Sequence, residues 1–173
     1  MSDIKKNIKV VPNFPIPGVS FKDITPILEN KVLFKKALLQ MADLFTTHFS
    51  DVDVIVGIES RGFIFASVLA FHLQKPLHLV RKKGKLPPDG LVRVISQSEY
   101  ATVELETQKG KGKALIVDDV LATGGTLKAA QELLEKAGFT NAGSLFFINL
   151  KYLNTESHYK TQSLVVYENQ LDA

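Results

Sequence analysis

The feature that most constrains the fold of this chain is the stretch ALIVDDVLATGG, residues 114–125. Leu115, Ile116 and Val117 are typical of a strand buried on both faces. Two acids and a Thr-Gly-Gly turn follow, and the next residues, TLKAAQELLEKAGF, carry the spacing of an amphipathic helix. Such a strand-turn-helix unit predicts a parallel sheet covered by helices.

The same alternation of strand and helix patterns runs through most of the chain. The chain has 173 residues, of which 45% are hydrophobic, and this is enough for one domain with a real core. We therefore predict a single α/β domain, residues 1–173, with a mostly parallel sheet flanked by helices. The pattern predicts helices over 31–49, 61–74 and 126–139, and strands over 52–60, 75–83, 114–117, 141–150 and 163–168.

Two segments depart from this alternation. Residues 1–30 include NFPIPGVSFKDITPIL, whose prolines remove backbone donors and impose turns, so we predict an irregular N-terminal arm. Residues 82–105 have loop chemistry and two β-like runs, LVRVIS and the start of TVELE, which favour a mobile β flap. The predicted core is then 31–81 and 106–173.

Composition limits the classes of function. Lys and Arg number 21 against 18 acids, and a scattered net charge of +3 argues against a nucleic-acid partner while leaving a small anionic ligand open. The chain has no cysteine, which excludes disulfides and thiolate metal sites. No apolar run reaches the ~18 residues that span a bilayer, and the first residues lack a secretory apolar region. We expect a cytoplasmic protein without a membrane partner.

The residues after the buried strand indicate a phosphorylated sugar. Asp118 and Asp119 come at the carboxyl end of a strand, where open α/β sheets bind ligands. The glycine turn and the following helix N-terminus can hold a phosphate through backbone amides, and paired carboxylates can accept hydrogen bonds from vicinal hydroxyls. Neither the dinucleotide fingerprint nor the P-loop is present. The alternative reading, that the acids merely end a strand and Thr126 merely caps a helix, explains each part alone but not their combination.

This arrangement resembles the donor-binding motif of the type I phosphoribosyltransferases, in which an apolar strand, Asp-Asp, three apolar residues and Thr-Gly-Gly-Thr bind 5-phosphoribosyl 1-pyrophosphate. The resemblance implies the fold of that family, and it implies that Asp118 and Asp119 hold the ribose 2′ and 3′ hydroxyls. It also implies a 5′-phosphate loop formed by Ala122, Thr123, Gly124, Gly125 and Thr126.

Three further stretches, FPIPGVSFKDITPIL, GIESRGF and VRKKGKLP, resemble the arm, the pyrophosphate loop and the flap base of the adenine-specific members of this family. The similarity covers about residues 12–168. It implies a homodimer, a cis peptide between Glu59 and Ser60, and Mg²⁺ carried by the donor without direct protein ligands. The implied pyrophosphate-binding residues are Ser60, Arg61, Gly62, Arg81, Lys82 and Lys85.

The same resemblance assigns the base site and the catalytic group. Phe21 and Val120 would enclose adenine, with main-chain contacts from Ser20 and Arg61. In the flap, SEYA is similar to the family's Leu-Glu-Tyr-Gly, which makes Glu99 the catalytic acid/base and Tyr100 its flap neighbour. Ser98 and Ala101 depart from that pattern, and alanine in place of glycine restricts positive φ.

Two other functions remain open at the level of sequence. The first is the same reaction on xanthine, hypoxanthine or guanine, whose enzymes commonly place a lysine in a strand after the donor motif. Here Lys151 lies only at the far end of that region, GSLFFINLKY. The second is a ligand sensor without turnover, which the retained Glu99 and the lack of a separate nucleic-acid module disfavour. The implied products of the preferred reaction are adenosine monophosphate (AMP) and pyrophosphate.

Overall fold

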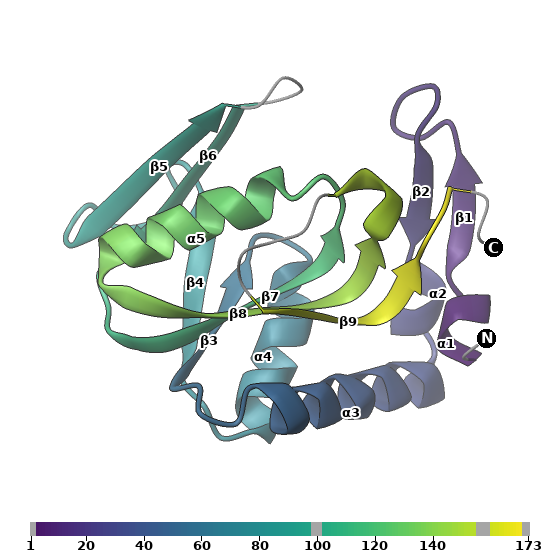
Figure 1. The fold of residues 1–173 in the computed structure, drawn as a ribbon, viewed down its shortest axis with the longest axis horizontal. Helices are drawn as coiled ribbons and strands as arrows, with labels where there is room; N and C mark the ends of the chain where they lie inside the picture. Colours follow the sequence, from purple (N-terminus) through teal and green to yellow (C-terminus); the bar gives the residue numbers. More distant parts are fainter. Residues whose placement is uncertain (1–2, 98–101, 155–159, 171–173) are drawn as a thin grey trace.

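A seven-stranded sheet forms the centre of the protein (Figure 1). The computed structural model describes residues 3–97, 102–154 and 160–170. Five neighbouring strands, in the order β4-β3-β7-β8-β9, run parallel, and β6 and β5 continue the sheet antiparallel beyond β4. The strands are β3 (Val54–Ile58), β4 (Leu77–Lys82), β5 (Leu91–Gln97), β6 (Thr102–Gln108), β7 (Gly112–Leu121), β8 (Phe139–Leu150) and β9 (Thr161–Tyr167).

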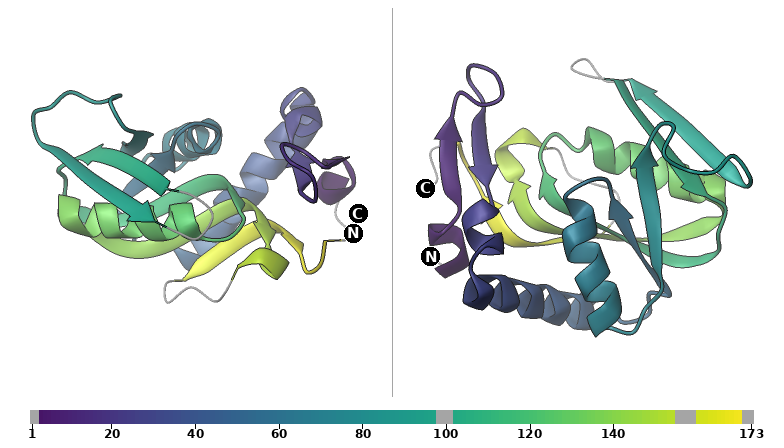
Figure 2. Two further views of the ribbon diagram at one scale, coloured as in Figure 1. Left: turned by 90° about the horizontal axis from the view of Figure 1, so that it is seen from above. Right: turned by 180° about the vertical axis from the view of Figure 1, so that it is seen from behind.

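Helices cover both faces of this sheet, which confirms the predicted α/β class. Helices α3 and α4 pack on one face, and α5 packs on the other, where it also contacts β5 and β6 (Figures 1 and 2). The helices are α1 (Asp3–Lys6), α2 (Thr25–Leu28), α3 (Lys31–His48), α4 (Gly62–His72), α5 (Gly125–Ala137) and the short 3-10 helix η1 (Lys151–Leu153).

The middle of strand β7, residues 114–117, is apolar at every position. Leu115 and Val117 belong to the core under α3 and α4, whereas Ala114 and Ile116 belong to the core under α5. Successive side chains of a strand point to opposite faces, so a strand covered on both sides needs an unbroken apolar run.

The helix boundaries follow from local chemistry. Asn30 caps α3, since its side-chain oxygen accepts hydrogen bonds from the amides of Val32 and Leu33 at 3.0 and 3.1 Å. Helix α5 lies between two left-handed glycines, Gly124 with φ of 86° and Gly138 with φ of 101°. It has no side-chain cap at its N-terminus.

The expectation of an irregular arm is wrong. Residues of the arm form a two-stranded antiparallel sheet, β1 (Lys9–Pro12) with β2 (Ser20–Asp23), besides the short helices α1 and α2. The prolines allow this because Pro15 and Pro17 lie in the connecting turn and Pro12 is the last residue of its strand, where a missing amide costs least.

The segment assigned to the flap is partly an extension of the sheet. The paired strands β5 and β6 join β4 through the register Arg81↔Glu106 and Lys82↔Leu105. Strands β4 and β6 therefore cross the expected boundaries at residues 82 and 105. In the described part of the chain, no helix combines the length and the apolar character that crossing a membrane requires.

Two phenylalanines of α4 give a test of this packing. Phe65 is fully buried and stacks on Phe147 with ring centres 5.0 Å apart, whereas Phe71 is 87% exposed. Phe65→Ala should lower the free energy of unfolding by about 3–5 kcal/mol, and Phe71→Ala by less than about 0.5 kcal/mol. Chemical denaturation measures both, and equal losses would contradict the assigned faces of α4.

Candidate functional site

Strands β3 and β7 bring the two predicted anion-binding turns together. They are parallel neighbours with Gly57 opposite Val117, so the residues that follow β3 and those at the end of β7 meet at one sheet edge. A cavity of about 610 Å³ opens there. It is lined by residues 58–61, 82–83, 102–105, 118–119 and 126.

The acids lie within β7, which continues to Leu121 because its pairing with β8 persists through Val120↔Ile148 and Leu121↔Asn149. Asp118 is half-buried and Asp119 is only 6% exposed. The amide of Asp119 donates to Asp118 Oδ1 at 2.9 Å. Burial and the neighbouring Asp119 charge raise the pKa of Asp118 to about 8. Burial also raises the pKa of Asp119, although the Arg61 charge opposes this.

Asp119 keeps one acceptor available for a ligand. Its Oδ2 lies 2.7 Å from Arg61 Nε, which is an ion pair by distance. The two groups do not meet with hydrogen-bond geometry, and within the described residues this buried Oδ2 has no hydrogen-bond partner. Since a buried unpaired acceptor is costly, a hydroxyl donor from a ligand would stabilise it.

The turn that follows β7 has the open geometry of an anion site. Gly124 adopts φ of 86°, and apart from the glycine and its two chain neighbours no atom of the described residues lies within 4 Å of where a Cβ would be built on it. Helix α5 begins at the next residue without a side-chain cap, so its first amides are left to solvent or to a ligand. Thr126 lines the cavity, and Thr123 is exposed. The predicted loop 122–126 thus borders the same cavity as the acids.

The first turn of α4 packs closely against the acids. A Cβ on Gly62 would lie 2.6 Å from Asp118 Oδ1 and 2.9 Å from the carbonyl oxygen of Val117, so only glycine fits there. The peptide between Glu59 and Ser60 is cis, which confirms that expectation. Ser60 is exposed, and both Ser60 and Arg61 line the cavity.

The basic side chains of residues 81–85 divide into two groups. Lys82 and Lys83 line the cavity, whereas Arg81 and Lys85 lie outside its lining. Arg81 Nε donates to Glu59 Oε2 at 3.2 Å, and the amide of Lys82 donates to the same oxygen at 3.0 Å. Burial opposes ionisation of Glu59, yet these hydrogen bonds hold its pKa below the ordinary value.

Sequence reasoning missed the acids that organise this basic segment. Besides Glu59, Glu104 lies 3.1 Å from Lys83 Nζ. Glu106 is fully buried, accepts from the amide of Gly84 at 2.8 Å, and also pairs with Arg93.

A signal for two of these acids was available in the sequence. Glu104 and Glu106 alternate about the apolar Leu105 in a β-like run, so both point to one face of the strand. Acids on one strand face near a basic run are typical of cross-strand ion pairs. The role of Glu59 has no such local signal.

Of the residues assigned to the base, Arg61 lines the cavity and the others lie outside its lining. Phe21, on β2, is half-buried, and its ring lies 5.3 Å from Arg61 Cζ. It also packs edge-on against Phe14, with ring centres 5.1 Å apart. Ser20 precedes it on β2, and Val120, on β7, packs against the core beneath α3 and α4. Arg61 therefore joins the arm to the acids.

Four residues of the predicted flap, Ser98, Glu99, Tyr100 and Ala101, lie outside the described residues. The assignments of Glu99 and Tyr100 therefore stay predictions. In the described part of the chain, no group of three or more His, Cys, Asp or Glu residues is arranged to hold a metal ion.

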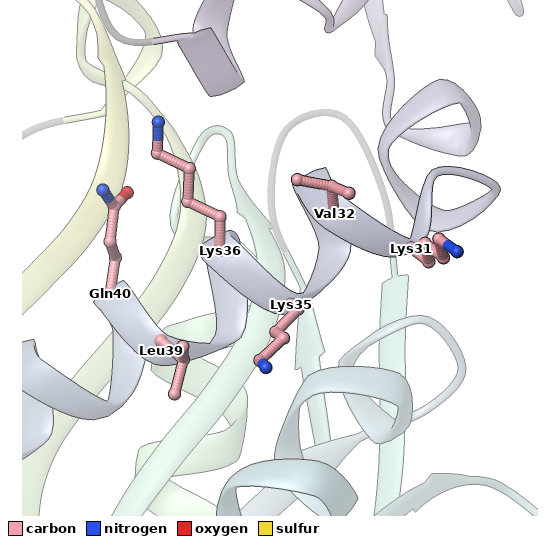
Figure 3. A pocket seen from close by; sticks show the side chains of 6 residues that line it. All are labelled: Lys31, Val32, Lys35, Lys36, Leu39 and Gln40. Carbon is pink, nitrogen blue, oxygen red and sulfur yellow. The ribbon is translucent and has the colours of Figure 1, made fainter.

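A second cavity, also of about 610 Å³, lies along α3 and contains none of the assigned residues (Figure 3). Its side chains spread from the helix in different directions: Lys35 and Leu39 point one way, Lys36 and Gln40 the other. It is a shallow surface of one helix and has no convergent polar groups, so the cavity at the acids is the better candidate site.

The raised pKa of Asp118 predicts a pH-dependent stability. Its folded pKa of about 8 exceeds the ordinary 3.8, so the folded state binds the proton more tightly, and this contribution to stability is lost as the pH rises from about 4 to 8. Asp118→Asn should therefore raise the free energy of unfolding by about 1–2 kcal/mol at pH 8, and by much less at pH 5.

Thermal and chemical unfolding at both pH values measure this difference. Asp51→Asn is the control, because Asp51 is exposed and its pKa is lowered by a hydrogen bond from Lys113, so that variant should gain nothing at pH 8. A stability gain for Asp118→Asn that is the same at pH 5 and pH 8 would rule out the titration as its cause.

Comparisons with known proteins agree with this geometry. The family model of the phosphoribosyl transferase domain matches residues 27–168. The adenine phosphoribosyltransferase of Bdellovibrio bacteriovorus is 44% identical over 171 residues, which cover 95% of this chain and 99% of that protein. The crystal structure of the enzyme of that name from Thermoanaerobacter pseudethanolicus has a TM-score of 0.87 at 34% identity, covering 95% of this chain and 98% of its own.

A second solved structure, that of the Giardia lamblia enzyme complexed with 9-deazaadenine, has a TM-score of 0.85 at 30% identity and covers 98% of this chain and 99% of its own. The family model spans the acids and both turns, and the relative and the two solved structures each cover at least 95% of this chain. This chain accordingly belongs to the phosphoribosyltransferase family and, within it, to the adenine phosphoribosyltransferases.

Proposed function

We propose that this chain transfers the 5-phosphoribosyl group of 5-phosphoribosyl 1-pyrophosphate to N9 of adenine, giving AMP and pyrophosphate in purine salvage. The observation that carries the proposal is one cavity lined by both acids, by Thr126 of the loop 122–126 and by residues 59–61 of the turn after β3. One donor molecule has a ribose, a 5′-phosphate and a pyrophosphate to match these three parts.

The donor would bind with its ribose hydroxyls on Asp118 and Asp119. The buried Oδ2 of Asp119 supports this, because it has no hydrogen-bond partner among the described residues and can accept from a hydroxyl. The 5′-phosphate would lie in the loop formed by Ala122, Thr123, Gly124, Gly125 and Thr126, against the first amides of α5.

The pyrophosphate would lie against Ser60, Arg61 and Gly62, with Lys82 beside them. Lys83 lines the same cavity and adds positive charge there. Arg81 and Lys85 lie outside the lining, and we propose that they act on the site of a partner subunit in a homodimer.

For the base, Phe21 would supply a stacking face and Val120 an apolar wall, while main-chain groups of Ser20 and Arg61 read the adenine edge. The contact between Arg61 and Phe21 supports a base site next to the ribose site, because it places the arm beside the acids. The fit of the base depends on the arm keeping this position.

The residues present suit Mg²⁺ that arrives with the donor. Two adjacent carboxylates, one of them beside Arg61, are too few to enclose the ion, but Mg²⁺ keeps several waters and needs few protein ligands. Asp118 and Asp119 would hold it through water. When bound, Mg²⁺ neutralises charge on the leaving pyrophosphate.

Catalysis would come from alignment and charge. Attack of N9 on the ribose C1 builds oxocarbenium character, and the acids and basic residues hold ribose and leaving group in line while negative charge develops on the pyrophosphate. Glu99 would exchange a proton at adenine N7. The segment 82–105 would close over the donor and exclude water. We also propose a cytoplasmic location, since charged phosphate esters do not cross a bilayer unaided.

The two alternative functions predict different outcomes for one experiment. An oxopurine enzyme needs a lysine in the strand after the donor motif, but Lys151 lies at the far end of this region, is exposed and pairs with Glu168 on the surface. A sensor would bind the donor without turnover. Product analysis with the donor, Mg²⁺ and, separately, adenine, hypoxanthine, guanine or xanthine distinguishes them.

We expect AMP from adenine only. A nucleotide from an oxopurine alone would keep the donor site and overturn the base assignment. Donor binding without any product would overturn the transferase activity and favour the sensor.

The proposed role of Glu99 predicts a loss of turnover. Glu99→Gln should lower kcat by about 10²- to 10⁴-fold, the usual contribution of general acid/base catalysis, with the KM of the donor little changed. Glu132→Gln, a surface change on α5 where Glu132 pairs with Lys136, is the control. Single-turnover rates isolate the chemical step, and wild-type rates for Glu99→Gln would remove this role.

A further inference from the structure

The end of β9 packs against strand β2 of the arm. Lys22 follows Phe21 on β2 and is only 3% exposed, and its Nζ lies 4.2 Å from the centre of the Tyr167 ring. Tyr167 is the last residue of β9 and is fully buried. Because neighbouring residues of a strand point to opposite faces, Lys22 packs inward while Phe21 points toward Arg61.

Two more contacts tie the same end of the chain to the arm. Lys5, on α1, donates from Nζ to the carbonyl oxygen of Val166 at 3.1 Å, and its Nζ lies 4.4 Å from the Tyr167 ring centre. Gln170 donates to the carbonyl oxygen of Gly18, in the turn of the arm, at 3.1 Å. Figures 1 and 2 show β9 ending beside β1 and β2.

The arm needs side-chain contacts to hold its position, because its strands pair only with each other. Strands β1 and β2 form a separate two-stranded sheet, with no ladder to the central sheet among the described strands. A two-stranded hairpin is marginally stable alone. Its position relative to the acids is therefore set by side-chain packing, in which a buried lysine over an aromatic ring is a strong and directional part.

We propose that Lys22 and Tyr167 are positioning residues for the base: together they fix β2 so that Phe21 stands against Arg61 and can stack on adenine. This inference rests on the proposed function. It assigns the base affinity of the enzyme partly to the edge strand β9, which does not line the cavity. Neither side chain needs to touch a substrate.

The test is a steady-state comparison of the KM for adenine with the KM for the donor. Lys22→Met keeps an unbranched side chain and removes the charge, and it should raise the KM for adenine about 5- to 30-fold. The donor KM and kcat should stay within about twofold, because the acids and the loop 122–126 are untouched. Lys22→Arg keeps a cation over the ring and should restore most of the adenine KM.

Lys160→Met is the matched control. Lys160 Nζ also lies over a buried aromatic ring, that of Phe49, at 5.3 Å, but next to the opposite end of β9. This variant should leave both KM values unchanged. Tyr167→Leu removes the other partner of the contact. In the double variant, its effect on the adenine KM should be less than additive with that of Lys22→Met.

The outcomes separate the two proposals. A wild-type protein that makes no AMP overturns the proposed function and this inference with it. A wild-type protein that makes AMP, with an unchanged adenine KM in folded Lys22→Met, overturns only the inference, as does an equal rise in both KM values. Circular dichroism checks folding. If Lys22→Met does not fold, the KM values of Tyr167→Leu for adenine and for the donor decide in the same way.

Discussion

The site depends on the parallel pairing of β3 with β7. This pairing places the turn after β3 against the acids of β7, and the contact is so close that only glycine fits at position 62, beside Asp118. Two helix N-termini, those of α4 and α5, then open toward one cavity. A sheet of this kind binds ligands at its carboxyl edge because that is where its helices begin and where backbone amides lack partners.

The same packing makes both acids costly to ionise. Burial raises the pKa of both acids, and Arg61 offsets this only partly for Asp119. Within the described residues the buried Oδ2 of Asp119 has an ion pair with Arg61 but no hydrogen-bond partner, and hydroxyl donors of a ribose would supply one. Arg61 also contacts Phe21, so the arrangement of the acids and the position of the arm are linked through one side chain.

The sequence was sufficient for the elements whose pattern is local. The apolar run before Asp118 and the helical spacing after Gly125 predicted β7 and α5 and the edge at which the acids lie. Contacts between distant residues were not predictable, because neither the pairing of Glu59 with Arg81 nor that of Lys22 with Tyr167 leaves a periodic signal. The β1–β2 pair was missed because proline-rich segments favour turns, and its prolines lie where no ladder amide is needed.

The central claim is that the cavity at the acids holds the phosphoribosyl donor. A crystal structure of the chain with the donor, Mg²⁺ and 9-deazaadenine, which has no N9 nucleophile, tests it most directly. We predict ribose hydroxyls within hydrogen-bond distance of Asp118 and Asp119, the 5′-phosphate on the amides of residues 123–126, and the base beside Phe21. A donor bound elsewhere, with Asp119 still facing only Arg61, would contradict this account.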